Sequence, residues 1–515
     1  MSERRSPQLP AIQPKQAPAP PRALTALWLA AIIALGTFLR LYQLGMKSYW
    51  LDENDSIRIA TLPLRSLLYT LFIPDRAPLY YLLAHGWITI AGTTEALMRL
   101  PSALAGIAAL PLFFLVGRTL FDRTVGLLAA ALLAVSEFAI HQAQEARYYS
   151  FVLLFTLLAA WCAIRARDQG KNLDFLLLTL SSLLLVATHY LALCWLIALW
   201  LYLLLRHPWM RGAAGTARQW LIWQGITMLG LLPLPLLAAR SITRGQYSPI
   251  NWVSAPQPWA PLRDAASYLI PPHAPAIATA AAALLALLLC AVGVVRWRRI
   301  GDDSRHRPRP STDTLWLLGC WIACPLLIPL VASWVMTPFY VARYTVPALP
   351  AVLLLVAAVV LALRPLLPLP LALLLIAIPI VPGLAGYYAS PGREDWRAVA
   401  ARITADSQPG DLLVFAPREG GALQQTFNRY DHSRIDRCEL DRTLPDTNAI
   451  TTALDACIAG HRRIWVILRY NADDNPWYAA DLARYFLVGE PPGLARRDEE
   501  HHAPLHLLLF ERRGP

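Results

Sequence analysis

Long apolar runs recur along the chain and constrain its fold more than any other feature. Most are roughly 18 to 24 residues long, enough to cross a bilayer as a helix. Charged residues make up only 16% of the 515 residues, against about 25% in soluble domains. We therefore predict an α-helical polytopic membrane protein with about 11 transmembrane helices. The predicted spans are residues 23–41, 97–117, 124–140, 149–166, 173–188, 191–205, 219–239, 274–295, 314–336, 345–363 and 366–388, of which 173–188 and 191–205 are short.

Basic residues gather in every second connection between these spans, which predicts an orientation. The basic set comprises the N-terminal tail and the connections near residues 118–123, 165–171, 206–218, 296–309 and 364. By the positive-inside rule these face the cytoplasm. The net charge of +12 then reports orientation, and no nucleic-acid partner is expected. The outer set comprises residues 42–96, 141–148, 189–190, 240–273, 337–344 and everything after residue 389.

The chain divides by composition into three parts. Residues 1–22 are rich in proline and basic side chains, which predicts a disordered cytoplasmic tail. Residues 23–389 form the membrane domain, and its first outer loop, 42–96, contains an amphipathic stretch at 54–72 typical of surface helices. Residues 390–515 have the composition of a soluble domain outside the membrane.

Short apolar strands and helical segments alternate in this last part, which predicts a small α/β domain. The expected helix is 395–403 and the expected strands are 412–416, 464–468 and 505–510. Cys438 and Cys457 are the only cysteines there, so they are candidates for a disulfide in an oxidising compartment. Spacing alone leaves open whether they are bonded.

An acidic cluster follows the first span directly. Asp52, Glu53 and Asp55 come after the aromatic pair Tyr49 and Trp50. One interpretation is a helix N-cap, where an acid is favourable through capping and the helix dipole alone. The other is a general base, because a carboxylate against an apolar wall at a membrane face is suited to take up a proton.

Four further groups of polar residues fall in outer connections. Arginine offers a fork of donors that matches phosphate. Each group also has a structural interpretation: a snorkelling arginine with an aromatic belt, a simple Glu145–Arg147 pair, or a structural histidine. Glycine-rich phosphate loops with a following lysine are absent from the sequence, so nucleotide-driven transport has no support. The groups are Asp75-Arg76 before Tyr80-Tyr81, Glu145 with Arg147, His189-Tyr190, and Arg343-Tyr344.

These motifs, in this order, resemble the GT-C superfamily of membrane glycosyltransferases. Within it, they are most similar to the bacterial family 39-like group, which comprises relatives of dolichyl-phosphate-mannose protein mannosyltransferases, RgtA/B/C/D-like proteins and the lipid A aminoarabinose transferase. The resemblance covers roughly residues 23–400. The matching runs are Trp50-Leu51-Asp52-Glu53, Pro78-Leu79-Tyr80-Tyr81, Leu100-Pro101-Ser102-Ala103-Leu104, Gln144-Glu145-Ala146-Arg147-Tyr148, Thr188-His189-Tyr190, Arg343-Tyr344-Thr345-Val346-Pro347 and Glu394-Asp395-Trp396-Arg397.

The resemblance implies a role for each polar group. Asp52 would activate the acceptor hydroxyl, with Glu53 beside it in support or merely beginning the helix, and Glu145 would be the acid of the second outer loop. Asp75 and His189 would hold a divalent cation (Mg²⁺, Mn²⁺ or Zn²⁺) if one is used. Many relatives have His-Pro-Pro where this chain has Arg76-Ala77-Pro78, which puts a histidine role there in doubt. The residues expected at the donor phosphate are Arg76, Tyr81, Arg147, Arg343 and Tyr344.

The function implied is an inverting glycosyltransferase in a bacterial cytoplasmic (inner) membrane. It would take a sugar from a polyprenyl-phosphate donor of the undecaprenyl-phosphate type and transfer it to a hydroxyl of a cell-envelope glycolipid such as lipopolysaccharide, a polysaccharide or a protein on the outer face. A flippase or transporter for a lipid-linked glycan is one alternative, although polar groups at mid-membrane would then be expected. An oligosaccharide ligase is the other, and only the size of the transferred group separates it from the first.

Overall fold

The structure is a computed structural model of the full chain. It describes residues 21–70, 78–205, 214–233, 253–277, 280, 312–336, 338–363, 368–416, 420–438, 447–469, 486, 493–502 and 504–513. The predicted tail 1–22 therefore lies almost wholly outside the described residues, as does most of the predicted span 274–295.

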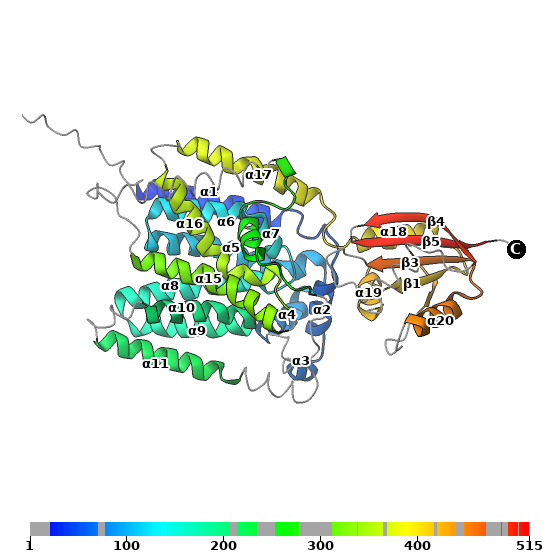
Figure 1. The fold of residues 1–515 in the computed structure, drawn as a ribbon, viewed down its shortest axis with the longest axis horizontal. Coiled ribbons are helices and arrows are strands. Elements are labelled where there is room, and N and C mark those ends of the chain that lie inside the picture. The colour runs from blue at the N-terminus through cyan, green and yellow to red at the C-terminus, as the bar shows by residue number, and fades with distance from the viewer. Residues whose placement is uncertain are drawn as a thin grey trace, which may run out of the picture.

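A bundle of long apolar helices makes up the larger part of the molecule (Figure 1). Among the described residues, six helices are long and apolar enough to cross a membrane, or seven if the bent pair α6–α7 counts as one span. The multi-pass helical fold is thus confirmed. The six are α1 (Arg22–Leu41), α5 (Glu95–Leu120), α8 (Tyr149–Gln169), α15 (Thr312–Val335), η3–α16 (Ala342–Ala362) and α17 (Leu369–Ala389).

The count of eleven spans stays a prediction. α9 (Asn172–Thr188) and the run η1–α10 (Tyr190–Leu205) are apolar but shorter than the six. α11 (Ala214–Leu231) coincides with the expected span 219–239, yet it is not among the helices apolar enough to cross alone. A short helix, α13 (Ala260–Ser267), follows in the outer connection 240–273.

A sharp break separates α6 (Arg123–Val135) from α7 (Glu137–Ala143). The two helices are bent by 62°, and Ser136 caps α7 by accepting from the amide of Ala139. The break frees the last carbonyls of α6, which need donors. Arg40, fully buried in α1, donates to the carbonyl oxygens of Leu133 and Ala134 at 3.0 and 3.2 Å. The second outer loop, residues 144–148, follows α7 directly.

The first outer loop folds into three short helices, α2 (Leu51–Ala60), α3 (Leu64–Thr70) and α4 (Pro78–Ala91). Pro63 separates α2 from α3, as expected of a residue that lacks an amide donor. Ile57 and Ala60 are buried, whereas Arg58 and Arg65 are exposed. α2 is therefore packed into the protein and does not lie with its apolar face free on the membrane, while α3 exposes Leu64 and Leu68.

The C-terminal part is a five-stranded mixed sheet with strand order β2-β1-β3-β5-β4. β1 pairs in parallel with β2 and β3, and β5 pairs antiparallel with β3 and β4. The strands are β1 (Leu412–Ala416), β2 (Asp436–Cys438), β3 (Arg463–Arg469), β4 (Leu494–His502) and β5 (Leu505–Arg512).

Helices cover both faces of this sheet, which makes three layers. Alternate residues of β1 face opposite sides: Leu413 and Phe415 pack with α18 (Trp396–Asp406) and α19 (Gly420–Phe427), while Leu412 and Val414 pack with α20 (Thr447–Ile458). The expected small α/β domain is confirmed in class. It lies beyond one end of the bundle, with α19 next to α2 (Figure 1).

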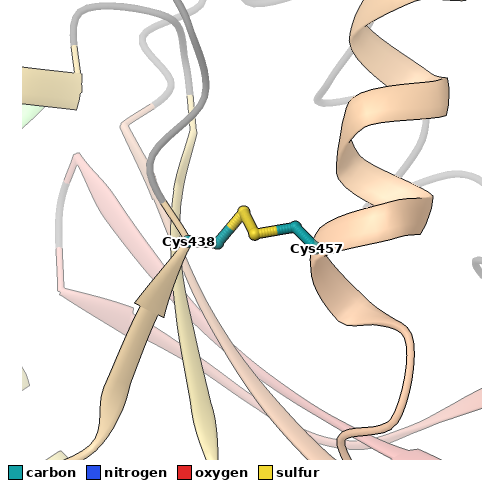
Figure 2. Close-up of a disulfide and its surroundings, with 2 residues drawn as sticks. All are labelled: Cys438 and Cys457. Carbon is teal, nitrogen blue, oxygen red and sulfur yellow. A yellow bond between two sulfur atoms is a disulfide. The ribbon is translucent and has the colours of Figure 1, made fainter.

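A disulfide joins β2 to α20. Cys438 and Cys457, the pair identified in the sequence, are bonded, with their Cα atoms 5.9 Å apart (Figure 2). The bond ties the edge strand of the sheet to the helix that covers it. Cys162, Cys194, Cys320 and Cys324 are buried thiols in the helical bundle.

Candidate functional site

Asp52 faces two arginines that come from distant parts of the chain. Its Oδ2 lies 3.3 Å from Nη2 of Arg343 and 3.7 Å from Nη2 of Arg147. The Asp52 side chain keeps 29% of its surface exposed, whereas those of Arg343 and Arg147 are 12% and 10% exposed. Asp52 is thus an acid with one accessible side, held between two largely buried guanidinium groups.

Arg147 is fixed in place by neighbours that leave it directed at Asp52. Its Nη1 donates to the Asp52 carbonyl at 3.1 Å and to the Ser56 hydroxyl at 2.8 Å, and its Nη2 donates to Tyr148 at 3.2 Å. Ser102 holds the Arg147 carbonyl at 2.7 Å. The sequence left open a simple Glu145–Arg147 side-chain pair. In the structure each of these two side chains has its own ion-pair partners instead.

Glu53 is turned into the protein, whereas Asp52 is partly exposed. It is fully buried, and Arg99 in α5 donates to both of its oxygens, at 2.8 and 2.7 Å. The amides of Ala146 and Trp50 also donate to it, at 2.7 and 3.4 Å. Glu53 thus ties the first loop to α5 and to the second outer loop, and its predicted support of Asp52 stays a prediction.

Glu145, the acid of the second outer loop, is likewise enclosed. Its Oε1 lies 3.0 Å from Nε of Arg393 and 3.1 Å from Nε2 of His141. Burial by itself would raise the pKa of Glu145, but the Arg393 guanidinium and the His141 ring outweigh burial and lower it to about 2. Glu145 is therefore ionised at neutral pH and bound to its neighbours.

An aromatic wall flanks the Asp52 pair. The His189 ring lies 4.9 Å from the Tyr148 ring and 5.0 Å from the Tyr344 ring, and Tyr344 packs near Tyr149. Burial, together with the nearby charges of Arg147 and Arg343, lowers the pKa of His189 to about 3. His189 is thus neutral at pH 7.

The remaining predicted site residues divide into two groups. Tyr81 is buried in α4 and packs edge-on against Tyr80, which in turn contacts Tyr148. Through Tyr80, Tyr81 therefore belongs to the aromatic wall, in which the Tyr148 ring centre lies 4.7 Å from the Arg147 guanidinium. Asp75 and Arg76 lie outside the described residues, so their predicted roles stay predictions.

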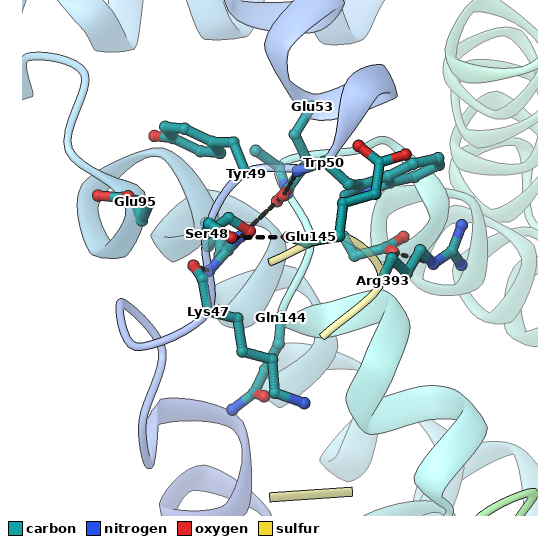
Figure 3. A network of polar contacts seen from close by, with 12 residues as sticks. Lys47, Ser48, Tyr49, Trp50, Glu53, Glu95, Gln144, Glu145 and Arg393 are labelled. Atoms are coloured by element: carbon teal, nitrogen blue, oxygen red, sulfur yellow. Dashed lines mark hydrogen bonds and ion pairs between the residues drawn. The ribbon is translucent and has the colours of Figure 1, made fainter. Parts of the chain in front are cut away.

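The C-terminal part holds the loop that carries Asp52. Glu394, 1% exposed, accepts from the Leu51 amide at 3.0 Å, from Nε1 of Trp396 at 2.7 Å and from Nε of Arg469 in β3 at 2.8 Å. The Ser48 hydroxyl donates to the Glu394 carbonyl at 2.7 Å. Figure 3 shows how the residues from Lys47 to Trp50 gather with Glu145 and Arg393.

Further contacts from the same part of the chain reach both sides of the loop. Tyr430 accepts from the amide of Tyr49 at 2.8 Å and donates to Glu95 at 2.8 Å. Arg429 donates to the side chain of Asn54 in α2. The Arg393 guanidinium lies 4.2 Å from the centre of the Trp50 ring. Residues after 390 therefore bind the backbone just before Asp52, at Tyr49 and Leu51, and the side chain of Asn54 just after it.

The described side chains at this face do not by themselves form a metal site. Asp52, Glu53 and Glu145 each face at least one guanidinium group, which already supplies positive charge. A cation here would depend on Asp75, outside the described residues. In the part of the chain that the structure describes, the cluster with metal-ligand spacing is elsewhere, at Glu499, His501 and His506 on the sheet.

Two arginines that bind the acids of this face, Arg99 and Arg393, were not identified from the sequence. Arg99 lies inside a predicted span, and a charged residue there is a recognisable signal of a buried partner or a functional site. Arg393 opens the C-terminal part and carries no comparable signal, because its partner Glu145 is 248 positions away in the chain. Its importance becomes visible only when the two loops are seen together.

One known protein family matches a segment of the membrane domain. Residues 75–234 match the model of the dolichyl-phosphate-mannose-protein mannosyltransferase family. This match covers less than a third of the chain; it supports the membership in the GT-C superfamily that the motifs predict and a glycosyltransferase of that type. Among curated proteins, none matches the sequence at a significant level.

Solved structures similar to this chain are remote in sequence. The apo oligosaccharyltransferase of Archaeoglobus fulgidus is 11% identical, with a TM-score of 0.49 over 86% of this chain and 69% of that one. The same archaeal enzyme with an inhibitory peptide and a dolichol-phosphate is also 11% identical, with a TM-score of 0.46 over 86% and 70% of the two chains. The donor-bound Pmt1–Pmt2 protein O-mannosyltransferase of S. cerevisiae is 16% identical, with a TM-score of 0.32 over 41% of this chain and 32% of its own.

Proposed function

We propose that this protein is an inverting glycosyltransferase that uses a polyprenyl-phosphate sugar as donor and a hydroxyl of a cell-envelope glycolipid, polysaccharide or protein as acceptor. The observation that carries the proposal is the partly exposed Asp52 carboxylate between Arg147 and Arg343. The reaction needs a base for the acceptor hydroxyl and positive charge for the departing phosphate. One acid and two arginines supply both.

The two arginines would make the availability of Asp52 as a base depend on the donor. In the structure, Arg147 and Arg343 are directed at the Asp52 carboxylate. A lipid phosphate would compete for the same guanidinium groups, which match phosphate oxygens well. When the phosphate takes these contacts, Asp52 is released to accept the proton of the acceptor hydroxyl. The oxygen then attacks the sugar carbon, and the bond to phosphate breaks on the opposite side.

The aromatic wall and the neutral His189 would complete the donor site. Tyr148, Tyr149 and Tyr344 offer apolar faces beside the two arginines, where the sugar or the first part of the lipid can pack. A divalent cation held by Asp75 and His189 would share the work of neutralising phosphate. Arg76 would be a third phosphate contact.

The C-terminal part would have two tasks. Its contacts to Leu51, Tyr49 and Asn54 position the loop of Asp52, and its place next to that loop suits a role in choosing the acceptor. We assign it to the outer side of a bacterial inner membrane, with residues 1–22 in the cytoplasm, because the basic connections predict that orientation.

Donor binding tests the proposal. Purified protein is titrated with a short-chain polyprenyl-phosphate sugar, and Arg147→Lys and Arg343→Lys are compared with the exposed control Arg462→Lys. A lysine keeps the charge but loses the planar fork, so we expect each site variant to bind at least tenfold more weakly and the control to bind normally. Asp52→Asn should bind donor as well as wild type or better, because it no longer competes for the arginines.

Two results would count against the assignment. Unchanged binding in both arginine variants would remove the donor phosphate from this site. Donor loss in Asp52→Asn would make Asp52 a donor or metal ligand and not the base. Mass spectrometry of the product separates this function from an oligosaccharide ligase, since a ligase adds a block of sugars in one step.

A further inference from the structure

Three side chains that ligate metals meet on one face of the hairpin formed by β4 and β5. Glu499 and His501 are two residues apart on β4, so they leave the same face of the strand. His506 on β5 is the direct partner of His501 in the strand register. The ligand atoms of the three side chains all lie within 4.8 Å of one another. Two paired strands fix their backbone positions.

The two oxygens of Glu499 have different neighbours. Oε2 is 2.6 Å from Nη1 of Arg496, while Oε1 is 3.3 Å from Nε2 of His501 and 3.9 Å from Nδ1 of His506. An arginine that holds the second oxygen of a carboxylate orients the first, as partners of metal ligands commonly do. The His501 and His506 rings are 4.4 Å apart between centres. The three groups therefore converge on one point.

The opposite face of the same hairpin shows what an ordinary ion-pair cluster looks like here. Glu500 lies 2.6 Å from Nε of Arg402 and 3.0 Å from Nε2 of His502. Arg402 in α18 also binds Asp498 at 2.8 Å. A fixed positive charge already satisfies these acids. At Glu499, Arg496 lies at Oε2, and the two imidazoles of His501 and His506 lie at Oε1. Oε1 is therefore the oxygen that can share a cation with both histidines.

We propose that Glu499, His501 and His506 bind a divalent transition-metal ion of the zinc class. Two imidazole nitrogens and one carboxylate oxygen are a donor set that suits Zn²⁺. Three protein ligands leave a fourth position open for water or another oxygen ligand. The His501 side chain is 63% exposed, so the site is accessible to the ion from solvent.

The site lies at the end of the sheet that faces the first outer loop. His506 is the register partner of Leu468 in β3, and the next residue, Arg469, holds Glu394, which binds the Leu51 amide. A bound ion would fasten β4 to β5 at that end. Its ligands are separate from Asp75 and His189, the pair considered above for the catalytic face.

Zinc binding by the full-length protein tests this site. Protein stripped by a chelator is titrated with Zn²⁺ alone in competition with a chromophoric zinc indicator, and Co²⁺ serves as a spectroscopic substitute. We expect one tight zinc per chain. Loss of an outer partner of a metal ligand already costs about 10–100-fold in affinity. The ligand variants His501→Ala and Glu499→Gln should therefore bind at least that much more weakly and lose the Co²⁺ visible absorption of a tetrahedral site.

Matched variants make the outcome decisive. His502→Ala removes the neighbouring histidine on the opposite face, and His189→Ala removes the histidine of the catalytic face; both should keep the zinc. His501 is exposed, so its replacement leaves the fold intact. The proposal is overturned if the wild type binds no zinc in this titration, if the zinc survives in His501→Ala and Glu499→Gln, or if it is lost in His189→Ala.

Discussion

Replacing Glu53 by glutamine separates structure from chemistry in the acidic pair. Glu53 is fully buried against Arg99, whose guanidinium donates to both carboxylate oxygens. Glu53→Gln leaves the Arg99 charge buried without its counter-ion, which costs about 3–5 kcal/mol. Asp52 is partly exposed, and its ion pairs are longer, at 3.3 and 3.7 Å. Asp52→Asn keeps a side-chain oxygen near the two arginines and should therefore cost less stability than Glu53→Gln.

The assay is thermal unfolding of both variants in the same detergent, followed by tryptophan fluorescence. We predict that Glu53→Gln is the less stable of the two variants, by a loss of about 3–5 kcal/mol from wild type. The double variant Glu53→Gln/Arg99→Gln should lose less stability than the two single variants together, because the pair is coupled. A Glu53→Gln protein that unfolds like wild type yet lacks activity would refute this reasoning and would indicate a catalytic role for Glu53.

Two further perturbations follow from the contacts of the outer loops. Glu394→Gln weakens the contact with the Leu51 amide. A small displacement of Asp52 should then lower the turnover rate about 10–100-fold while donor binding is kept. The control is Glu511→Gln, whose partners Arg462 and Arg497 both lie in the C-terminal part; equal rates in both variants would contradict the positioning role. The pKa of Glu145 is lowered from 4.5 to about 2. The ionised Glu145 therefore contributes at most about 3 kcal/mol to the free energy of unfolding. This contribution is complete above pH 4.5 and is lost as the pH falls towards 2. Acid unfolding of wild type should show this loss and Glu145→Gln should not; identical acid profiles would contradict it.

The helical bundle could be predicted because its signal is local. Each span is a run of apolar residues, and the alternation of basic connections needs no knowledge of packing. The strands β1, β3 and β5 are recognisable for the same reason: β1 and β3 contain runs of consecutive buried apolar residues, and β5 is apolar at Leu505 and from Leu507 to Phe510. β2 is only three residues long, and β4 carries the sequence Arg496 to His502, which is polar throughout. Neither shows the apolar alternation that marks a strand.

The site could be predicted only in part because most of its contacts are long-range. Asp52, Arg147, His189 and Arg343 were identified from motifs in separate outer connections, and the structure brings all four together. The difference between Asp52 and Glu53 could not be read from the sequence, because it depends on which side of α2 faces Arg99. The hold of Glu394 on Leu51 spans 343 positions, and no local pattern announces it.

Transfer activity tests the central claim most directly. Wild type and Asp52→Asn are reconstituted in liposomes with a polyprenyl-phosphate sugar and a cell-envelope acceptor extract, and transferred radiolabelled sugar is counted. We predict that Asp52→Asn loses transfer by at least about 100-fold, the scale of a general base, while its unfolding temperature and donor binding stay close to wild type. Turnover by Asp52→Asn at the wild-type rate would contradict the assignment of Asp52 as the base.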